Sequence, residues 1–188
     1  MKSRTWFPAI LAALVLLVSA CTGPDDDAAS ESTESAAGGI PCPEPSVMPA
    51  GGGDPITAVT LPCLGGDGEA MPLSDGAPMV INIWASWCAP CRDELPSVEA
   101  YAAKGKVAVL GVNTQDTEDA ARSIVEDFGL TFPSRFDPDG TLLATLGKRV
   151  LPVTVLVTAE GTVAHTYSGP ALSEDALAAL VEKHLDVA

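Results

Sequence analysis

Two cysteines separated by two residues, Cys88 and Cys91, form the part of the sequence best suited to chemistry. Thiols at this spacing can switch between a dithiol and a disulfide with little backbone movement. An apolar run over residues 79–84 precedes the pair, and a helical pattern begins near Arg92. We therefore expect Cys88 at a helix N-terminus, where unpaired N–H groups and the helix dipole favour a thiolate. The arrangement predicts thiol–disulfide exchange.

Two simpler interpretations of the cysteine pair fit less well. A structural zinc site needs about four ligands, usually two cysteine pairs or one pair with spaced histidines. This chain has one CxxC, and His165 and His184 lie nineteen residues apart. We expect both histidines at the surface rather than in a catalytic site, and we predict no metal or other cofactor. A plain structural disulfide would not require a tryptophan before it or a proline within it.

The N-terminal segment is typical of an export signal. Lys2 and Arg4 give it a positive start, and residues 10–18 are apolar but too few for an ordinary transmembrane helix. The sequence Val-Ser-Ala-Cys that follows resembles the lipobox of bacterial lipoproteins, in which the cysteine is acylated. We predict a signal peptide over residues 1–20 and lipidation of Cys21, with a plain secretory signal as the alternative.

The charge of the chain restricts its partners. Removal of the signal peptide would change the net charge from −15 to −17, which argues against nucleic acid and against electrostatic docking on anionic lipid. Residues 21–39 are expected to form a lipidated cysteine with a disordered acidic tether, because they lack apolar periodicity. Residues 40–188 then make one domain on the outer face of a bacterial cytoplasmic membrane, a compartment that permits disulfides.

The pattern of apolar residues predicts an α/β fold. Expected strands are a small hairpin at residues 57–61 and 70–73, then residues 79–84, 107–112, 153–157 and 163–167. Expected helices follow the CxxC, cover residues 120–128 up to Gly129, and start after Ser173; residues 142–146 are short and helical or irregular. Strands that alternate with helices before an antiparallel hairpin predict a three-layer α/β/α sandwich with an N-terminal β-hairpin extension.

Two stretches carry a resemblance to a known family. They are Val-Ile-Asn-Ile-Trp-Ala-Ser-Trp-Cys-Ala-Pro-Cys-Arg-Asp-Glu-Leu-Pro at residues 80–96 and Val-Leu-Pro-Val-Thr at residues 150–154. The chain resembles the thioredoxin fold over about residues 56–186, and more closely the TlpA/ResA-type extracytoplasmic thiol–disulfide oxidoreductases. The resemblance implies that Cys88 attacks and Cys91 resolves. It also implies a cis Pro152 and a substrate-binding surface, made by Trp87, Pro90, Leu151 and Pro152.

Glu94 matches a glutamate that this family carries three residues after the second cysteine. Cytoplasmic thioredoxins instead carry a buried aspartate on the preceding strand, where this chain has Asn82. Residues at positions i and i+3 share one helix face, so the carboxylate of Glu94 could accept the proton of Cys91. The alternative is a solvated helix residue beside Arg92 and Asp93.

Cys42 and Cys63 lie outside this motif. In an oxidising compartment we expect them to pair with each other, which would close a loop of about twenty residues and stabilise the domain by roughly 3 kcal/mol. A second redox pair that relays electrons is the alternative. Trp84, unlike Trp87, is expected in the core because it ends a buried strand.

The expected activity is that of a lipid-anchored enzyme. The resemblance implies a monomeric disulfide reductase of exported proteins such as apocytochrome c, which receives its electrons from a membrane thiol transporter. Some relatives are oxidants that form disulfides in exported proteins, and the dipeptide between the cysteines does not decide the direction. A copper-delivery lipoprotein is the non-enzymatic alternative, although it would need a wider cysteine spacing and a nearby histidine.

Overall fold

The computed structural model describes residues 55–66, 71–72, 76–185 and 187. The predicted signal peptide, the lipidated Cys21, the acidic tether and Cys42 lie outside these residues. Within them, no helix is both long enough and apolar enough to span a bilayer.

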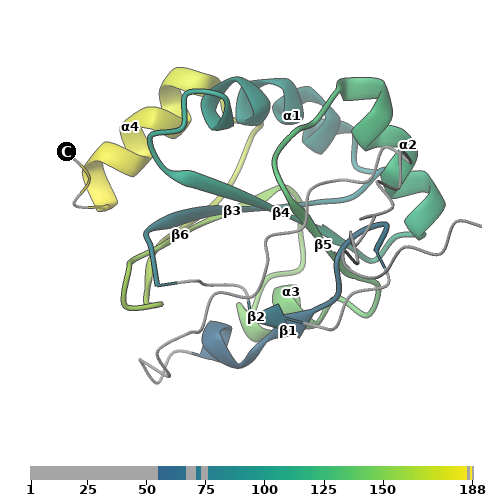
Figure 1. Cartoon of the computed structure of the whole chain (residues 1–188), viewed down its shortest axis with the longest axis horizontal. Helices are drawn as coiled ribbons and strands as arrows, with labels where there is room; N and C mark the ends of the chain where they lie inside the picture. The colour runs from purple at the N-terminus through teal and green to yellow at the C-terminus, as the bar shows by residue number, and fades with distance from the viewer. Residues whose placement is uncertain (1–54, 67–70, 73–75, 186, 188) are drawn as a thin grey trace, which may run out of the picture. The chain divides into compact units, whose positions relative to one another are not determined.

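The elements follow one another as strands and helices in alternation before a final hairpin (Figure 1). The first half contains the 3-10 helix η1 (Pro55–Ala58), β1 (Thr60–Leu61), β2 (Met71–Pro72), β3 (Met79–Trp84), α1 (Ala89–Ala102) and β4 (Ala108–Thr114). The second half contains α2 (Glu118–Phe128), β5 (Ser134–Asp137), α3 (Thr141–Thr145), β6 (Val153–Val157), β7 (Val163–Ser168) and α4 (Glu174–His184).

A five-stranded mixed sheet in the order β5-β4-β3-β6-β7 forms the centre of the domain. Strand β3 runs parallel to β4 and antiparallel to β6, and all six of its residues are buried, which explains its nearly continuous apolar sequence. Strands β1 and β2 form a separate antiparallel pair. The predicted N-terminal hairpin is therefore confirmed.

Helices α1, α2 and α4 cover one face of the sheet, and α3 with η1 covers the other (Figure 1). Each face of the sheet carries its own hydrophobic core. Because side chains alternate along β3, Val80 and Trp84 pack in the core under α1, α2 and α4, whereas Ile81 and Ile83 pack in the core against α3 and η1. Asn82 shares the face of Val80 and Trp84, so its side chain lies beneath α1. The predicted three-layer α/β/α sandwich is confirmed.

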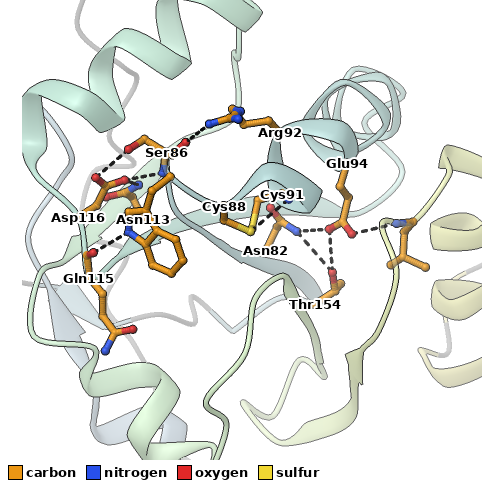
Figure 2. The surroundings of a disulfide bond; sticks show 12 residues. Asn82, Ser86, Cys88, Cys91, Arg92, Glu94, Asn113, Gln115, Asp116 and Thr154 are labelled. Atoms are coloured by element: carbon orange, nitrogen blue, oxygen red, sulfur yellow. Dashed lines mark hydrogen bonds between the residues drawn. A yellow bond between two sulfur atoms is a disulfide. The ribbon is translucent and has the colours of Figure 1, made fainter.

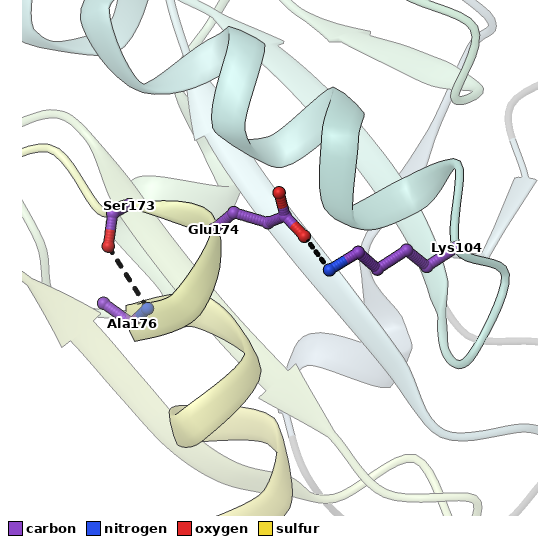
Figure 3. A network of polar contacts seen from close by, with 4 residues as sticks. All are labelled: Lys104, Ser173, Glu174 and Ala176. Carbon is purple, nitrogen blue, oxygen red and sulfur yellow. Dashed lines mark hydrogen bonds and ion pairs between the residues drawn. The ribbon is translucent and has the colours of Figure 1, made fainter.

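Helix boundaries follow local sequence signals. Thr117 and Ser173 cap α2 and α4 by accepting hydrogen bonds from the N–H groups three residues later, and Gly129 ends α2 with φ of 60°. Lys104, just beyond α1, forms an ion pair with Glu174 in the first turn of α4 (Figure 3). This ion pair joins the end of α1 to the start of α4.

Two parts of the predicted secondary structure are wrong. Residues 57–61 were expected as a strand, but the chain forms η1 first, because Ile56 and Val59 are both buried at helical spacing after a proline that suits a helix start. Strand β5 was not predicted, because its sequence Ser-Arg-Phe-Asp lacks an apolar pattern. Its buried Asp137 is instead satisfied by Thr114 and by the N–H groups of Thr141 and Leu142.

Candidate active site

Cys88 and Cys91 form a disulfide at the start of α1 (Figure 2). Cys88 is the N-cap of the helix, as predicted, and its Sγ accepts a hydrogen bond of 3.2 Å from the N–H of Cys91. Cys88 is 5% exposed and Cys91 is 1% exposed, so Cys88 is the more accessible of the two residues. A thiol at this helix N-terminus is favoured as a thiolate by the dipole and by that N–H group.

The turn before Cys88 is closed by its N–H, which donates to the carbonyl of Ala85 at 3.1 Å. Ser86 and Trp87 are the two central residues of this turn. The Trp87 side chain is 58% exposed, and its indole Nε1 donates to the carbonyl of Gln115 at 2.9 Å. Trp84 is fully buried, so the predicted difference between the two tryptophans is confirmed.

Glu94 lies in the interior, on the face of α1 that also buries Cys91 and Leu95. One carboxylate oxygen, Oε1, accepts a hydrogen bond from Asn82 Nδ2 at 2.6 Å and a longer one from Thr154 Oγ1 at 3.5 Å. The other oxygen accepts from the N–H of Leu172 at 2.9 Å. Figure 2 shows this carboxylate beyond the disulfide, between α1, β3 and β6.

Burial raises the pKa of Glu94 above its ordinary value, and the three hydrogen bonds oppose that rise without cancelling it. Glu94 is 1% exposed, so the alternative of a solvated helix residue is wrong. A buried carboxylate that binds a proton readily, one helical turn after Cys91, has the chemical character of a proton acceptor.

The segment before β6 completes the surroundings of the disulfide. The Leu151–Pro152 peptide bond is cis, as predicted. Val153 pairs with Ile83 in antiparallel register, so the residues that precede β6 run beside the turn that follows β3. Of the residues predicted to form the substrate surface, Pro90 is exposed and Leu151 is half-buried, whereas Pro152 is buried.

Val150 was not singled out from the sequence, yet it is 62% exposed. Among the described residues, Val150 and Trp87 are the exposed large apolar side chains. The register of β3 and β6 brings both toward the edge of the sheet that carries the disulfide.

Sequence reasoning also missed the polar residues that surround this site. Asp116 accepts hydrogen bonds from Ser86, Asn113 and Thr117, and Thr154 contacts both Asn82 and Glu94. The available signal was position, because Asn113 lies near the end of β4 and Asp116 follows that strand, which runs parallel to the β3 strand that leads to the CxxC. The carboxyl ends of adjacent parallel strands meet at one edge of a sheet.

Cys63 lies outside the CxxC motif, beside β5, which is an outer strand of the sheet. It is disulfide-bonded and buried, and it forms an isolated antiparallel bridge with Arg135. The Arg135 guanidinium Nη1 donates to Cys63 Sγ at 3.2 Å. Because Cys42 lies outside the described residues, its pairing with Cys63 stays a prediction.

The two histidines are not simply surface residues. The rings of His165 on β7 and His184 on α4 stack with centroids 4.0 Å apart, and both residues are half-buried. Burial lowers the pKa of His165, and the neighbouring His184 and Lys183 lower it further. Within the described part of the chain, no group of three or more His, Cys, Asp or Glu side chains is placed to hold a metal ion.

Comparisons with known proteins agree with this geometry. The Redoxin family model matches residues 52–180. The thiol:disulfide interchange protein DsbE of Escherichia coli is 32% identical over 139 residues, which cover 70% of this chain and 75% of that protein. The thiol:disulfide interchange protein HelX of Rhodobacter capsulatus is 33% identical over 138 residues, covering 71% and 77%.

Solved structures of similar proteins share the fold. A secreted Mycobacterium tuberculosis disulfide oxidoreductase, described as homologous to E. coli DsbE, aligns with a TM-score of 0.61 and 28% identity, covering 70% of this chain and 99% of that one. The exposed lipoprotein thioredoxin of Streptococcus pneumoniae aligns with a TM-score of 0.57 and 27% identity, covering 66% and 97%. With a disulfide that caps a helix and a family model that spans most of the domain, the chain belongs to the Redoxin family and is a thioredoxin-like thiol–disulfide oxidoreductase.

Proposed function

We propose that the enzyme reduces disulfides in exported proteins, with Cys88 as the nucleophile and Cys91 as the resolving thiol. The Cys88 thiolate attacks one sulfur of the substrate disulfide, forms a mixed disulfide and releases the first substrate thiolate. Cys91 then loses its proton to Glu94 and attacks Cys88 Sγ. The Cys88–Cys91 disulfide forms, the second substrate thiolate leaves, and two electrons have passed to the substrate.

The observation that carries this proposal is the buried Glu94 carboxylate on the same helix face as Cys91. A negative charge in the interior disfavours a thiolate on a neighbouring buried sulfur. Cys91 then adds no thiolate stabilisation to the dithiol state, and a dithiol that is not stabilised in this way keeps a low reduction potential. A low potential suits a reductant.

The substrate surface that we propose consists of Trp87, Pro90, Leu151 and Pro152, with Val150 added. Trp87 and Val150 are exposed apolar side chains at the disulfide edge, where an extended substrate segment could cover them. The resemblance to TlpA/ResA-type proteins supports apocytochrome c as one such exported substrate, and it supports a membrane thiol transporter as the electron donor.

We further propose that Cys21 anchors the enzyme to the outer face of the cytoplasmic membrane. The lipobox-like sequence before Cys21 supports this location, as does the similarity to the exposed pneumococcal lipoprotein thioredoxin. Residues 21–39 would then act as the tether and residues 40–188 as the catalytic domain of a monomer. Cys42 would pair with Cys63 as a structural disulfide.

The reduction potential of the Cys88–Cys91 pair tests the direction. Equilibration against dithiothreitol or glutathione buffers should give a value nearer to roughly −270 mV, as in thioredoxin, than to the roughly −120 mV of a strong oxidant. A value above roughly −180 mV, the level of a disulfide isomerase, would overturn the reductase direction and support an enzyme that forms disulfides.

A pair of variants tests the roles of the two cysteines. Cys91→Ser should trap a mixed disulfide between Cys88 and a substrate peptide, whereas Cys88→Ser should trap none. Brief iodoacetamide treatment of the reduced enzyme, followed by peptide mapping, should label Cys88 first. Preferential labelling of Cys91 would refute the assignment of the nucleophile.

A further inference from the structure

The position of Cys88 depends on the turn that precedes it. The hydrogen bond from the Cys88 N–H to the Ala85 carbonyl makes Ser86 and Trp87 the central residues of a four-residue turn. Cys88 ends this turn and at the same time caps α1. Movement of the turn would therefore move the sulfur away from the helix N-terminus, whose N–H groups favour its thiolate.

Both central residues of the turn are attached to the segment after β4. The Asp116 carboxylate accepts hydrogen bonds from Ser86 at two points, the N–H at 2.5 Å and Oγ at 2.8 Å. The Trp87 indole donates to the carbonyl of Gln115 at 2.9 Å. Figure 2 shows Ser86, Asp116 and Gln115 together on the side of Cys88 opposite Glu94.

The remaining polar group of Ser86 is held from α1. Arg92 Nη1 donates to the Ser86 carbonyl at 2.6 Å. The N–H, the hydroxyl and the carbonyl of Ser86 are therefore all bonded to side chains outside the turn. A residue fixed at three points has little freedom to rotate, which favours one orientation of the cysteine two residues later.

Asp116 is itself held in place. Its carboxylate also accepts from Asn113 Nδ2 at 3.0 Å and from the N–H of Thr117 at 2.8 Å, so each oxygen receives two hydrogen bonds. Partial burial acts to raise the pKa of Asp116, but these hydrogen bonds outweigh it and keep the pKa below the ordinary value. An ionised carboxylate only accepts, which matches the four donors around it.

Gln115 connects this arrangement to the next strand. It has a positive φ of 52°, and its N–H donates to the carbonyl of Asp137 at 3.0 Å. Its side chain lies where a Cβ on Gly140 would be, since such an atom would sit 2.9–3.1 Å from three of its atoms. The segment that holds the turn is thus fixed from β5 as well as from β4.

We propose that Asp116 is a positioning residue for the nucleophile: by holding Ser86 at two points, it keeps Cys88 Sγ at the N-terminus of α1. The proposal rests on the assignment of Cys88 as the attacking thiol. It adds a residue that touches neither sulfur but determines how reactive one of them is.

The test measures the rate of Cys88 alkylation by iodoacetamide as a function of pH in the reduced full chain, read by peptide mapping. In Asp116→Ala we expect the profile to move to higher pH and the rate constant at pH 7 to fall roughly tenfold, the effect of losing about one hydrogen bond to a charged sulfur. The rate constant of Asp116→Asn should lie between those of Asp116→Ala and the wild type, because the NH₂ group of the asparagine would face one of the hydrogen-bond donors. The same changes should slow the attack on a model disulfide.

Asp119→Ala is the matched control. Asp119 is exposed on α2, three residues after Asp116, and within the described residues its side chain makes no hydrogen bond or ion pair. The substitution Asp119→Ala removes the same charge without changing the contacts of the turn, so the alkylation profile of Cys88 in this variant should overlay that of the wild type. A general effect of net charge on the thiol would instead appear in both variants.

Ser86 provides a second route that does not depend on the folding of Asp116→Ala. Ser86→Ala should shift the profile in the same direction, Ser86→Thr should restore it, and Ser86→Ala should add little in the Asp116→Ala background. Lower thermal stability with an unchanged alkylation profile in Asp116→Asn and Ser86→Ala would overturn the proposal. If the wild type is labelled at Cys91 first, the assignment of the nucleophile fails instead, which is a separate result.

Discussion

The substitution Glu94→Gln removes a charge from the interior while it leaves the shape of the side chain nearly unchanged. The effect on stability follows from the raised pKa of Glu94. Between the ordinary value of 4.5 and the raised value, the folded state binds more protons than the unfolded state. The free energy of unfolding of the wild type therefore falls as pH rises through this window, by about 1.4 kcal/mol for each unit of the pKa shift.

Glutamine has no such pH dependence. Its amide can keep most of the contacts, because its oxygen can accept from the Leu172 N–H while its NH₂ donates to Thr154 or to a turned Asn82 amide. The loss of up to one hydrogen bond should cost about 1 kcal/mol at every pH. The difference in unfolding free energy, variant minus wild type, should rise from pH 4.5 upward and become constant above the raised pKa of Glu94. Urea titrations of the oxidised protein at several pH values measure it.

The same substitution should slow the enzyme. Without a proton acceptor, Cys91 must lose its proton to water, and general-base catalysis typically contributes about 10²-fold or more. The first step, attack by Cys88, should be nearly unaffected. Stopped-flow release of the first and second thiols from a disulfide-linked reporter peptide separates the two steps.

Asp93→Asn is the control, because Asp93 is the exposed neighbour on the same helix. It should change neither the pH dependence of stability nor the second step. A Glu94→Gln enzyme with a normal second step would show that the buried carboxylate takes no proton from Cys91. A flat difference curve would show that the carboxyl is not desolvated.

Two further predictions concern the packing and the second disulfide. Gly111→Ala should destabilise the fold by about 1–3 kcal/mol through overpacking, because its Cβ would lie 2.4 Å from Ser134 Oγ and 2.9 Å from a Phe132 ring carbon; denaturant unfolding measures this, and Ser134→Ala should recover part of the loss. Non-reducing peptide mass spectrometry should find Cys42 bonded to Cys63, and this bond should outlast the active-site disulfide in dithiothreitol; a link from either residue to the CxxC as the main species would contradict it.

Local signals predicted those parts of the fold that depend on neighbours in sequence. The apolar run of β3, the caps at Ser173 and Gly129, and the position of Cys88 at a helix start each follow from a few adjacent residues. The helix face that Glu94 shares with Cys91 indicated a possible role, but the sequence left a solvated residue as the alternative to a buried one. The family resemblance added the cis bond before Pro152, which no local pattern specifies.

Contacts between distant segments were not predictable in the same way. Glu94 receives one hydrogen bond from Leu172, seventy-eight residues later, and Asp116 holds Ser86 across thirty residues. Both contacts depend on the order and register of the strands, which bring the ends of β3, β4 and β6 to one edge. Strand β5 was not predicted for a related reason. Its buried Asp137 finds hydrogen-bond donors in residues that the fold brings beside it, among them Thr114 and Leu142.

Glu94 and Asp116 show how one functional group takes two roles beside one disulfide. Glu94 is buried and accepts three hydrogen bonds, and the effect of burial prevails, so its pKa rises. Asp116 is only partly buried and receives four, so the hydrogen bonds prevail and its pKa falls. The first carboxylate is suited to take up a proton from the resolving thiol, whereas the second remains ionised and keeps its four donors in place. In the mechanism that we propose, exchanging these environments would leave Cys91 without a base and Ser86 without a fixed acceptor.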